Sequence, residues 1–480
     1  MRRRRLFALT ATTIALYYAY HIARLTLLPP LPSGDDAIIH ISHCLYEGVD
    51  QYLHGPSQYP NFIHLTCHLA AAGNPIYAIW FIKIFAFAAA FIPIALLLHE
   101  ISKKDPKIAI PLAAGLAAYG TGYLRTLADG SIFNLFSHGM YLASLILLHN
   151  QKPLLAGVAA GLALTHYYGI LYLATLLPAV MPQCGRRRFL YGVAVGFLPT
   201  APKWVTLALT IKKSGAAAVG TAEPPAWAIQ DWLNYAYTPD LRWGDAAFYA
   251  YVAAVTVLAL AAKERKILAT ATSPALYVAG TLTTVLLPWL HSVAVLNLAY
   301  RLYRLLPTVV ILLIAILSTN AEKKPATLAA ILLATAALYG LASSNPTPHG
   351  LYRIDYDALK TLLDLSHEIC NGGVVATGQT ATYMKIVCPN TLLIYPPKIL
   401  DAMAADDPEA AEARRILAQI QNGTIHGYSW LVAQEPVPGQ WYDEAVATFI
   451  QQLKDEIYIL GDVKYILKNQ GATLYIVKIR

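Results

Sequence analysis

Long apolar stretches separated by short basic turns make up roughly the first 343 residues of the chain. They lie at residues 6–28, 76–100, 108–124, 131–149, 154–166, 168–182, 189–210, 246–262, 268–290, 305–319 and 326–343. Stretches of this kind predict membrane-spanning helices, about eleven in all. The two shortest, 154–166 and 168–182, are broken at Thr165–Gly169 and predict a hairpin rather than two full spans.

Composition agrees with a polytopic membrane protein. Of 480 residues, 56% are hydrophobic and only 13% are charged, too few to cover a water-soluble surface. The net charge of +8 comes largely from turns such as Arg186–Arg188 and Lys323–Lys324, so it indicates topology rather than nucleic-acid binding. Basic turns face the cytoplasm, which predicts a cytoplasmic N-terminus and an extracytoplasmic C-terminus in the cell membrane.

The pattern changes after residue 343, where charged residues become common and no long apolar run remains. We therefore predict a membrane domain at 1–343 and an extracytoplasmic α/β or α+β domain at 344–480. Within the second domain, the patterns predict helices at 355–369, 407–421 and 442–453, and strands at 373–377, 457–460 and 473–477. Glu412 and Arg415 are spaced to pair on one helix face.

The cysteines divide between the two sides of the membrane. Cys44, Cys67, Cys370 and Cys388 fall in predicted outer segments, where the pairs Cys44–Cys67 and Cys370–Cys388 fit either disulfides or buried thiols. The fifth, Cys184, lies beside a cytoplasmic arginine cluster. No Cys-x-x-Cys spacing is present, which argues against a zinc site.

The first outer loop holds the most informative polar residues. Asp35 and Asp36 follow the first span directly, and His40 lies four residues beyond Asp36. An amphipathic helix at 37–48 and a second juxtamembrane helix ending near Gly73 complete the loop, with the sequence Gln58-Tyr59-Pro60-Asn61-Phe62-Ile63-His64 between them. Two further elements fall at predicted loops: Arg125–Gly130, which contains Asp129, and Arg301–Pro307, which precedes a late span.

This arrangement resembles the GT-C membrane glycosyltransferases, which include protein O-mannosyltransferases, lipid A aminoarabinose transferases and oligosaccharyltransferase catalytic subunits. The Gly-x-Asp-x-x-x-His pattern is similar to the first acidic motif of archaeal oligosaccharyltransferases, and Tyr-Pro-x-x-x-His to the mannosyl- and arabinosyl-transferase type. The resemblance implies transfer of a sugar from a polyprenyl-phosphate carrier to a protein, lipid or glycan acceptor at the outer face. The second acidic motif has one Asp instead of Asp-x-Asp, so a divalent cofactor, Mg²⁺ or Mn²⁺, stays open.

The chemistry assigns provisional roles to these residues. Inverting sugar transfer needs a carboxylate base, and guanidinium groups match the oxygens of a leaving phosphate. We expect Asp36 as the base, with Asp35 as second choice and Asp129 orienting the base, a sugar hydroxyl or a metal. Arg301, Arg304 and Lys83 are the candidates for donor phosphate binding, and His40, Tyr59, His64 and His166 for substrate binding.

Each candidate also has a structural explanation. Asp35, Asp36 and Asp129 could cap helices, and Arg301 and Arg304 could extend toward the interface. A metal-dependent oligosaccharyltransferase-like enzyme would need a further acidic ligand, for which Glu223, Asp231 and Asp240 are available in the loop 211–245. A lipid or sugar transporter and a non-catalytic membrane scaffold are the alternatives that involve no chemistry.

Overall fold

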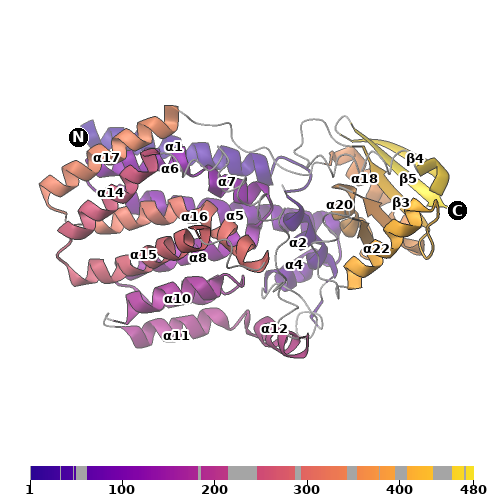
Figure 1. The fold of residues 1–480 in the computed structure, drawn as a ribbon, viewed down its shortest axis with the longest axis horizontal. Coiled ribbons are helices and arrows are strands. Elements are labelled where there is room, and N and C mark those ends of the chain that lie inside the picture. Colours follow the sequence, from indigo (N-terminus) through magenta and orange to yellow (C-terminus); the bar gives the residue numbers. More distant parts are fainter. Residues whose placement is uncertain are drawn as a thin grey trace.

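The chain folds into a long bundle of helices at one end and a smaller region with a β-sheet at the other, as the computed structural model shows (Figure 1). The structure describes residues 2–32, 34–46, 48–49, 62–181, 185–214, 246–286, 293–319, 321–342, 354–377, 379–394, 408–435, 457–469 and 472–480.

The bundle helices mostly follow the apolar stretches. They are α1 (Arg2–Thr26), α5 (Pro75–Ser102), α6 (Pro106–Tyr119), α7 (Thr121–Ala128), α8 (Ile132–His149), α9 (Pro153–Ala163), α10 (Gly169–Val180), α11 (Arg186–Phe197), α12 (Ala201–Ser214), α14 (Ala246–Ala261), α15 (Arg265–Leu286), α16 (Val293–Leu317) and α17 (Lys323–Ala342). The hairpin predicted at 154–182 is present as α9 and α10.

Three predictions for the bundle were wrong in detail. The stretch 189–210 is two helices, α11 and α12, separated by a turn at residues 198–200 that contains Pro199. The stretch 108–124 breaks at Gly120, where the Tyr18 hydroxyl lies 1.8 Å from where a Cβ would be, so only glycine fits. The element 301–307 does not precede a helix but lies inside α16, which begins at Val293.

The outer surface of the bundle is apolar. Four of the described helices are long and apolar enough to cross a membrane, namely Arg5–Thr26 within α1, α5, α8 and α17. Large aliphatic side chains such as Leu16, Ile84 and Leu338 are more than half exposed on these helices. Aliphatic surface of this extent is stable in lipid and not in water, so the chain is a membrane protein.

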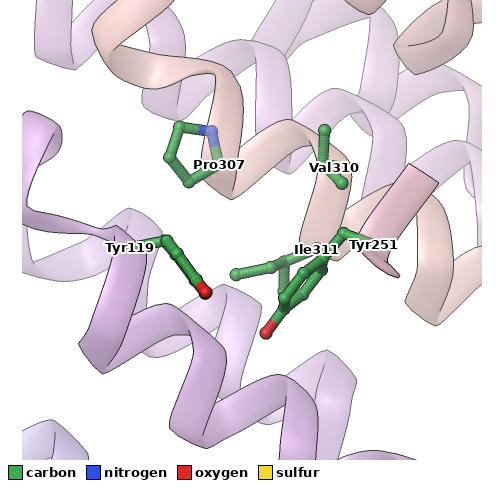
Figure 2. A pocket seen from close by; sticks show the side chains of 5 residues that line it. All are labelled: Tyr119, Tyr251, Pro307, Val310 and Ile311. Carbon is green, nitrogen blue, oxygen red and sulfur yellow. The ribbon is translucent and has the colours of Figure 1, made fainter. Parts of the chain in front are cut away.

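Helix α16 crosses the centre of the bundle and contains Pro307. A proline inside a helix cannot donate the backbone hydrogen bond of its position, which loosens the helix there. A small cavity lies beside it, lined by Tyr119, Tyr251, Pro307, Val310 and Ile311 (Figure 2). Its lining carries no charged group, so it is not a candidate for the phosphate site.

Two short helices, α2 (Asp35–Tyr46) and α4 (Ile63–Ala71), lie between the bundle and the sheet region (Figure 1). They are the two predicted juxtamembrane helices, although α2 begins at Asp35 instead of residue 37. A disulfide joins Cys44 on α2 to Cys67 on α4, and a second joins Cys370 to Cys388. Both pairings that the sequence left open are therefore present as disulfides.

The sheet region contains α18 (Tyr356–Asp364), α19 (Ser366–Ile369), η4 (Cys370–Gly372), β1 (Val374–Thr377), α20 (Gln379–Val387), β2 (Thr391–Ile394), α22 (Pro408–Gln421), β3 (Trp430–Gln434), β4 (Gly461–Asn469) and β5 (Ala472–Ile479). The strand order is β2-β1-β3-β5-β4, with β1 parallel to β2 and β3, and β5 antiparallel to β3 and β4.

Predictions for this region were partly right. The strands at 373–377 and 473–477 and the helices at 355–369 and 407–421 are present, and Arg415 pairs with Glu412 at 2.6 Å. The predicted strand 457–460 is helical, and β4 starts at Gly461, whose missing side chain allows close approach to the backbone of Lys478 on β5. The predicted helix 442–453 lies outside the described residues, and the division into two domains at 343 stays a prediction.

The sheet region is attached to α2 through a shared core. Tyr46 donates a hydrogen bond to the Ile386 carbonyl at 2.9 Å, and Ser42 donates to that of Lys385 at 3.3 Å. One continuous apolar cluster includes Ile38 of α2 and Met384 of α20. Because α2 begins with the two aspartates, this packing also fixes the acidic end of the first loop.

Candidate functional site

The loop before α2 lies directly against the turn after α7. Gly34 has φ +88°, and a Cβ there would lie 2.2 Å from the Asp129 carbonyl carbon and from the Gly130 nitrogen. This position therefore requires glycine, both for its backbone conformation and for the close approach. The consequence is that two acidic segments far apart in the sequence meet at one end of the bundle.

A hydrogen bond joins the two segments. Ser131 Oγ lies 3.2 Å from Asp36 Oδ2, and a hydroxyl donates to a carboxylate. Ser131 is also the residue before α8, where serine ordinarily caps the helix through its side chain, yet no such cap is present. Its hydroxyl is therefore directed to Asp36, which is partly exposed and stays within reach of solvent.

Asp129 lies beside two arginines. Its Oδ2 forms an ion pair with Arg304 Nη1, and its Oδ1 lies 3.4 Å from Arg125 Nε. Arg304 is only 2% exposed, whereas Asp129 retains 21% and Arg125 20%. The prediction that Asp129 could cap α8 is wrong, because Asp129 follows the last residue of α7 and its carboxylate is paired with arginine.

The formal charges of this region balance. Arg125 and Arg304 contribute +2, and Asp129 together with the nearby Asp36 contributes −2. Gly122 of α7 allows this arrangement, since a Cβ there would lie 2.6 Å from the Arg304 carbonyl oxygen. A carboxylate and a partly compensated cation pair side by side can hold an anionic group and accept a proton at the same place.

The histidines of the first loop form a cluster with Phe133 of α8. His40 Nδ1 and His64 Nε2 are 3.1 Å apart, and the His40 ring meets the Phe133 ring edge-to-face at 4.2 Å between centroids. His40 and His64 are 2% and 1% exposed. The structure thus brings these two predicted residues together, one turn along α2 from Asp36, where they hold α2, α4 and α8 in register.

Lys83 and His166 have partners of their own. Lys83 Nζ donates to the Pro29 carbonyl at 2.6 Å and lies 4.4 Å from the centre of the Trp80 ring. Lys83 therefore fixes the chain just before the acidic pair. His166 stacks on Tyr167 at 4.2 Å and accepts a hydrogen bond from the Tyr168 backbone at 3.3 Å, between α9 and α10.

Other predicted residues are only partly described or lie outside the described residues. Asp35 and Arg301 are placed by their helices alone, as the first residue of α2 and a residue of α16. Tyr59, Glu223, Asp231 and Asp240 lie outside the described residues. Within the described ranges, no group of three or more His, Cys, Asp or Glu side chains is arranged to hold a metal ion. Metal dependence therefore stays open.

Sequence reasoning missed two residues of this site, Arg125 and Ser131. Arg125 precedes Asp129 by four residues on α7, a spacing that places both side chains on one helix face and could have revealed the pair. Ser131 gave no such signal, because serine before an apolar helix is the usual pattern of a cap.

No protein-family model matches the sequence, and neither does any curated protein. Among solved structures, a mycobacterial arabinofuranosyltransferase, AftD, is similar over 99% of this chain and 40% of its own, with a TM-score of 0.47 and 14% identity. The chain thus spans less than half the length of that protein. Similarity at this level assigns neither the family nor the reaction.

Proposed function

We propose that the protein is a GT-C-type membrane glycosyltransferase that moves a sugar from a polyprenyl-phosphate carrier to an acceptor at the outer face of the membrane. The observation that carries this proposal is the meeting of the segment that holds Asp36 with the turn that holds Asp129, whose carboxylate pairs with Arg304 and Arg125. These groups, nearly 100 and 270 positions from Asp36 in the sequence, gather at one end of an apolar bundle. The motif resemblance of the first loop supports the same reaction.

The proposed reaction is a single displacement at the sugar C1. An acceptor hydroxyl attacks C1 while its proton passes to the Asp36 carboxylate, and the bond from C1 to the phosphate oxygen breaks. The polyprenyl phosphate leaves with the electron pair of that bond. Arg304 and Arg125 stabilise the charge that develops on it, as preorganised cations do in a site shielded from water.

Asp129 has a supporting role in this proposal. A buried arginine without a carboxylate beside it is costly, and Asp129 offsets that cost. Ser131 orients the Asp36 carboxylate through its hydroxyl. His40 and His64 would then position α2, and Lys83 the chain before it, instead of contacting the donor phosphate.

The test compares Asp36→Asn with wild type on a panel of polyprenyl-phosphate sugars, using purified protein in lipid nanodiscs. Asparagine caps a helix as well as aspartate does, so a loss of turnover reports the base and not the cap. We expect a rate loss of about 10²-fold to 10⁴-fold, the range for a general base.

The matched control is Asp105→Asn. Asp105 caps α6 by accepting from the Lys107 backbone at 2.8 Å, at a turn remote from Asp36 along the bundle. This variant should turn over like wild type. Equal turnover by Asp36→Asn and wild type would leave Asp36 as a helix-terminal residue and refute the proposed base. A folded protein that neither binds nor consumes any donor of the panel would favour the transporter or scaffold instead.

A further inference from the structure

Two polar side chains on α8 lie deeper in the bundle than the site, on the same helix face. Asn134 and His138 are 1% and 0% exposed and four residues apart, so they are neighbours along the helix. Asn134 follows Ser131 by three residues, or about 4.5 Å along the helix axis. Polar groups inside a membrane bundle are costly unless hydrogen-bonded, so their partners need to be identified.

The hydrogen bonds around Thr308 fix the tautomer of His138. Thr308 Oγ1 donates its one hydrogen to the Leu305 carbonyl at 2.7 Å, and it lies 2.8 Å from His138 Nε2. The hydroxyl must therefore accept from His138, which places a hydrogen on Nε2. No ion pair of His138 is found in the described part of the chain, and a charged imidazole there would be strongly disfavoured. Nδ1 then carries a lone pair and no hydrogen.

This lone pair and one amide donor are left over. Among the residues that the structure describes, His138 Nδ1 and Asn134 Nδ2 are both buried and without a hydrogen-bond partner. Tyr172 of α10 contacts both residues, since its hydroxyl lies 3.4 Å from Asn134 Oδ1 and its ring centre 5.8 Å from that of His138. The two unpartnered atoms therefore belong to side chains one turn apart on the face of α8 that packs against Tyr172.

We propose that Asn134 and His138 together bind one hydroxyl group. A hydroxyl is a small group that donates to Nδ1 and accepts from Nδ2 at the same time, whereas a carbonyl only accepts and an ammonium group only donates. A water molecule satisfies the pair in the same way. The second source is a hydroxyl of the donor sugar, because a sugar held at Asp36 would extend along α8 toward Asn134. That second source rests on the proposed function, and the first does not.

The first experiment measures the hydrogen bonding of His138 Nδ1 in the protein without donor. Protein labelled with ¹⁵N-histidine is studied in lipid nanodiscs, and the His138 resonance is assigned by its loss in His138→Gln. Glutamine can keep the hydrogen bond to Thr308, so this variant removes the Nδ1 acceptor with little change to the packing. We expect the Nδ1 shift of a hydrogen-bonded acceptor and magnetisation transfer to it from water protons. If this result is obtained in the absence of donor, the bound hydroxyl group belongs to water.

The second experiment distinguishes the sugar. Asn134→Leu removes the amide donor at similar volume, and donors that lack single hydroxyls are compared on wild type and variant. If the sugar hydroxyl binds here, Asn134→Leu raises the donor KM about 10-fold, which is the equivalent of one lost hydrogen bond. The deoxy donor that lacks this hydroxyl then has the same KM with wild type and with the variant. If only water binds, the KM is unchanged.

The outcomes separate the two proposals. An Nδ1 shift typical of an unbonded acceptor, both with and without donor, overturns the hydroxyl site whatever the activity. A hydrogen-bonded Nδ1 in a protein that consumes no donor would contradict the proposed function and leave the hydroxyl site standing with water as its ligand.

Discussion

Gly34→Ala tests whether the contact between the two acidic segments sets the geometry of the site. The added Cβ would lie 2.2 Å from two backbone atoms of Asp129 and Gly130, whereas ordinary contacts begin at 3.4 Å. The segments must separate by about 1.2 Å, the difference between these distances. A displacement of about 1 Å between catalytic groups costs up to about 10²-fold in rate, so we expect a loss of that size.

Gly73→Ala is the matched control. Gly73 also has a positive φ, +78°, but no atom lies within 4 Å of its Cβ position. Both variants therefore share the conformational cost of the left-handed region, about 1–2 kcal/mol, and only Gly34→Ala adds the clash. Sugar transfer and thermal unfolding are measured on both in nanodiscs. The expected result is activity lost in Gly34→Ala and kept in Gly73→Ala, with Gly34→Ala the less stable of the two by about 1–3 kcal/mol because of the clash. Equal activity in the two variants would refute the reasoning.

Three further predictions concern the parts that hold the site. Arg304→Met should destabilise the protein by about 3 kcal/mol and abolish transfer, because it leaves Asp129 partly buried beside one arginine; undiminished donor binding would contradict this. Replacing Cys44 and Cys67 together by alanine should lower the unfolding free energy by about 3 kcal/mol, with activity falling as α2 loosens, and an unchanged melting temperature would contradict it. The hydrogen bond from Arg415 lowers the pKa of Glu412. The stabilisation that this pair gives the fold is therefore present above the ordinary carboxyl pKa and is lost as the pH falls through the lowered value. Glu412→Gln should slightly weaken this dependence of stability on acid pH, as unfolding measured at a series of pH values would show.

Local patterns predicted the helices of the bundle well. Apolar length gave α5 and α8 almost to the residue, whereas α2 begins at Asp35, two residues before its predicted start. Local patterns do not predict a break in a helix when the cause is a contact with another part of the chain. The Tyr18 hydroxyl of another helix occupies the space of a side chain at Gly120, and the start of α16 at Val293 was missed because Arg301 and Arg304 interrupt its apolar run.

The site was predicted as a set of residue types but not as an arrangement. Asp36 and Asp129 were both singled out, yet their meeting depends on Gly34, whose role appears only when the Asp129 backbone is placed beside it. Ser131 looked like an ordinary cap because its use by Asp36 is a contact between distant segments. Residue spacing predicts pairs within one helix, whereas contacts between distant segments are identified only from the three-dimensional structure.

The most direct measurement of the proposed reaction is ³¹P spectroscopy of a polyprenyl-phosphate sugar incubated with the purified protein in water, with and without an added hydroxyl-bearing acceptor. Transfer converts the phosphodiester of the donor into the phosphomonoester of the free carrier, which has a distinct resonance. The account predicts this conversion with wild type and with Asp105→Asn, and its loss with Asp36→Asn. Conversion at the same rate by Asp36→Asn would contradict the role of Asp36, and a bound donor left unconverted by wild type would contradict the reaction itself.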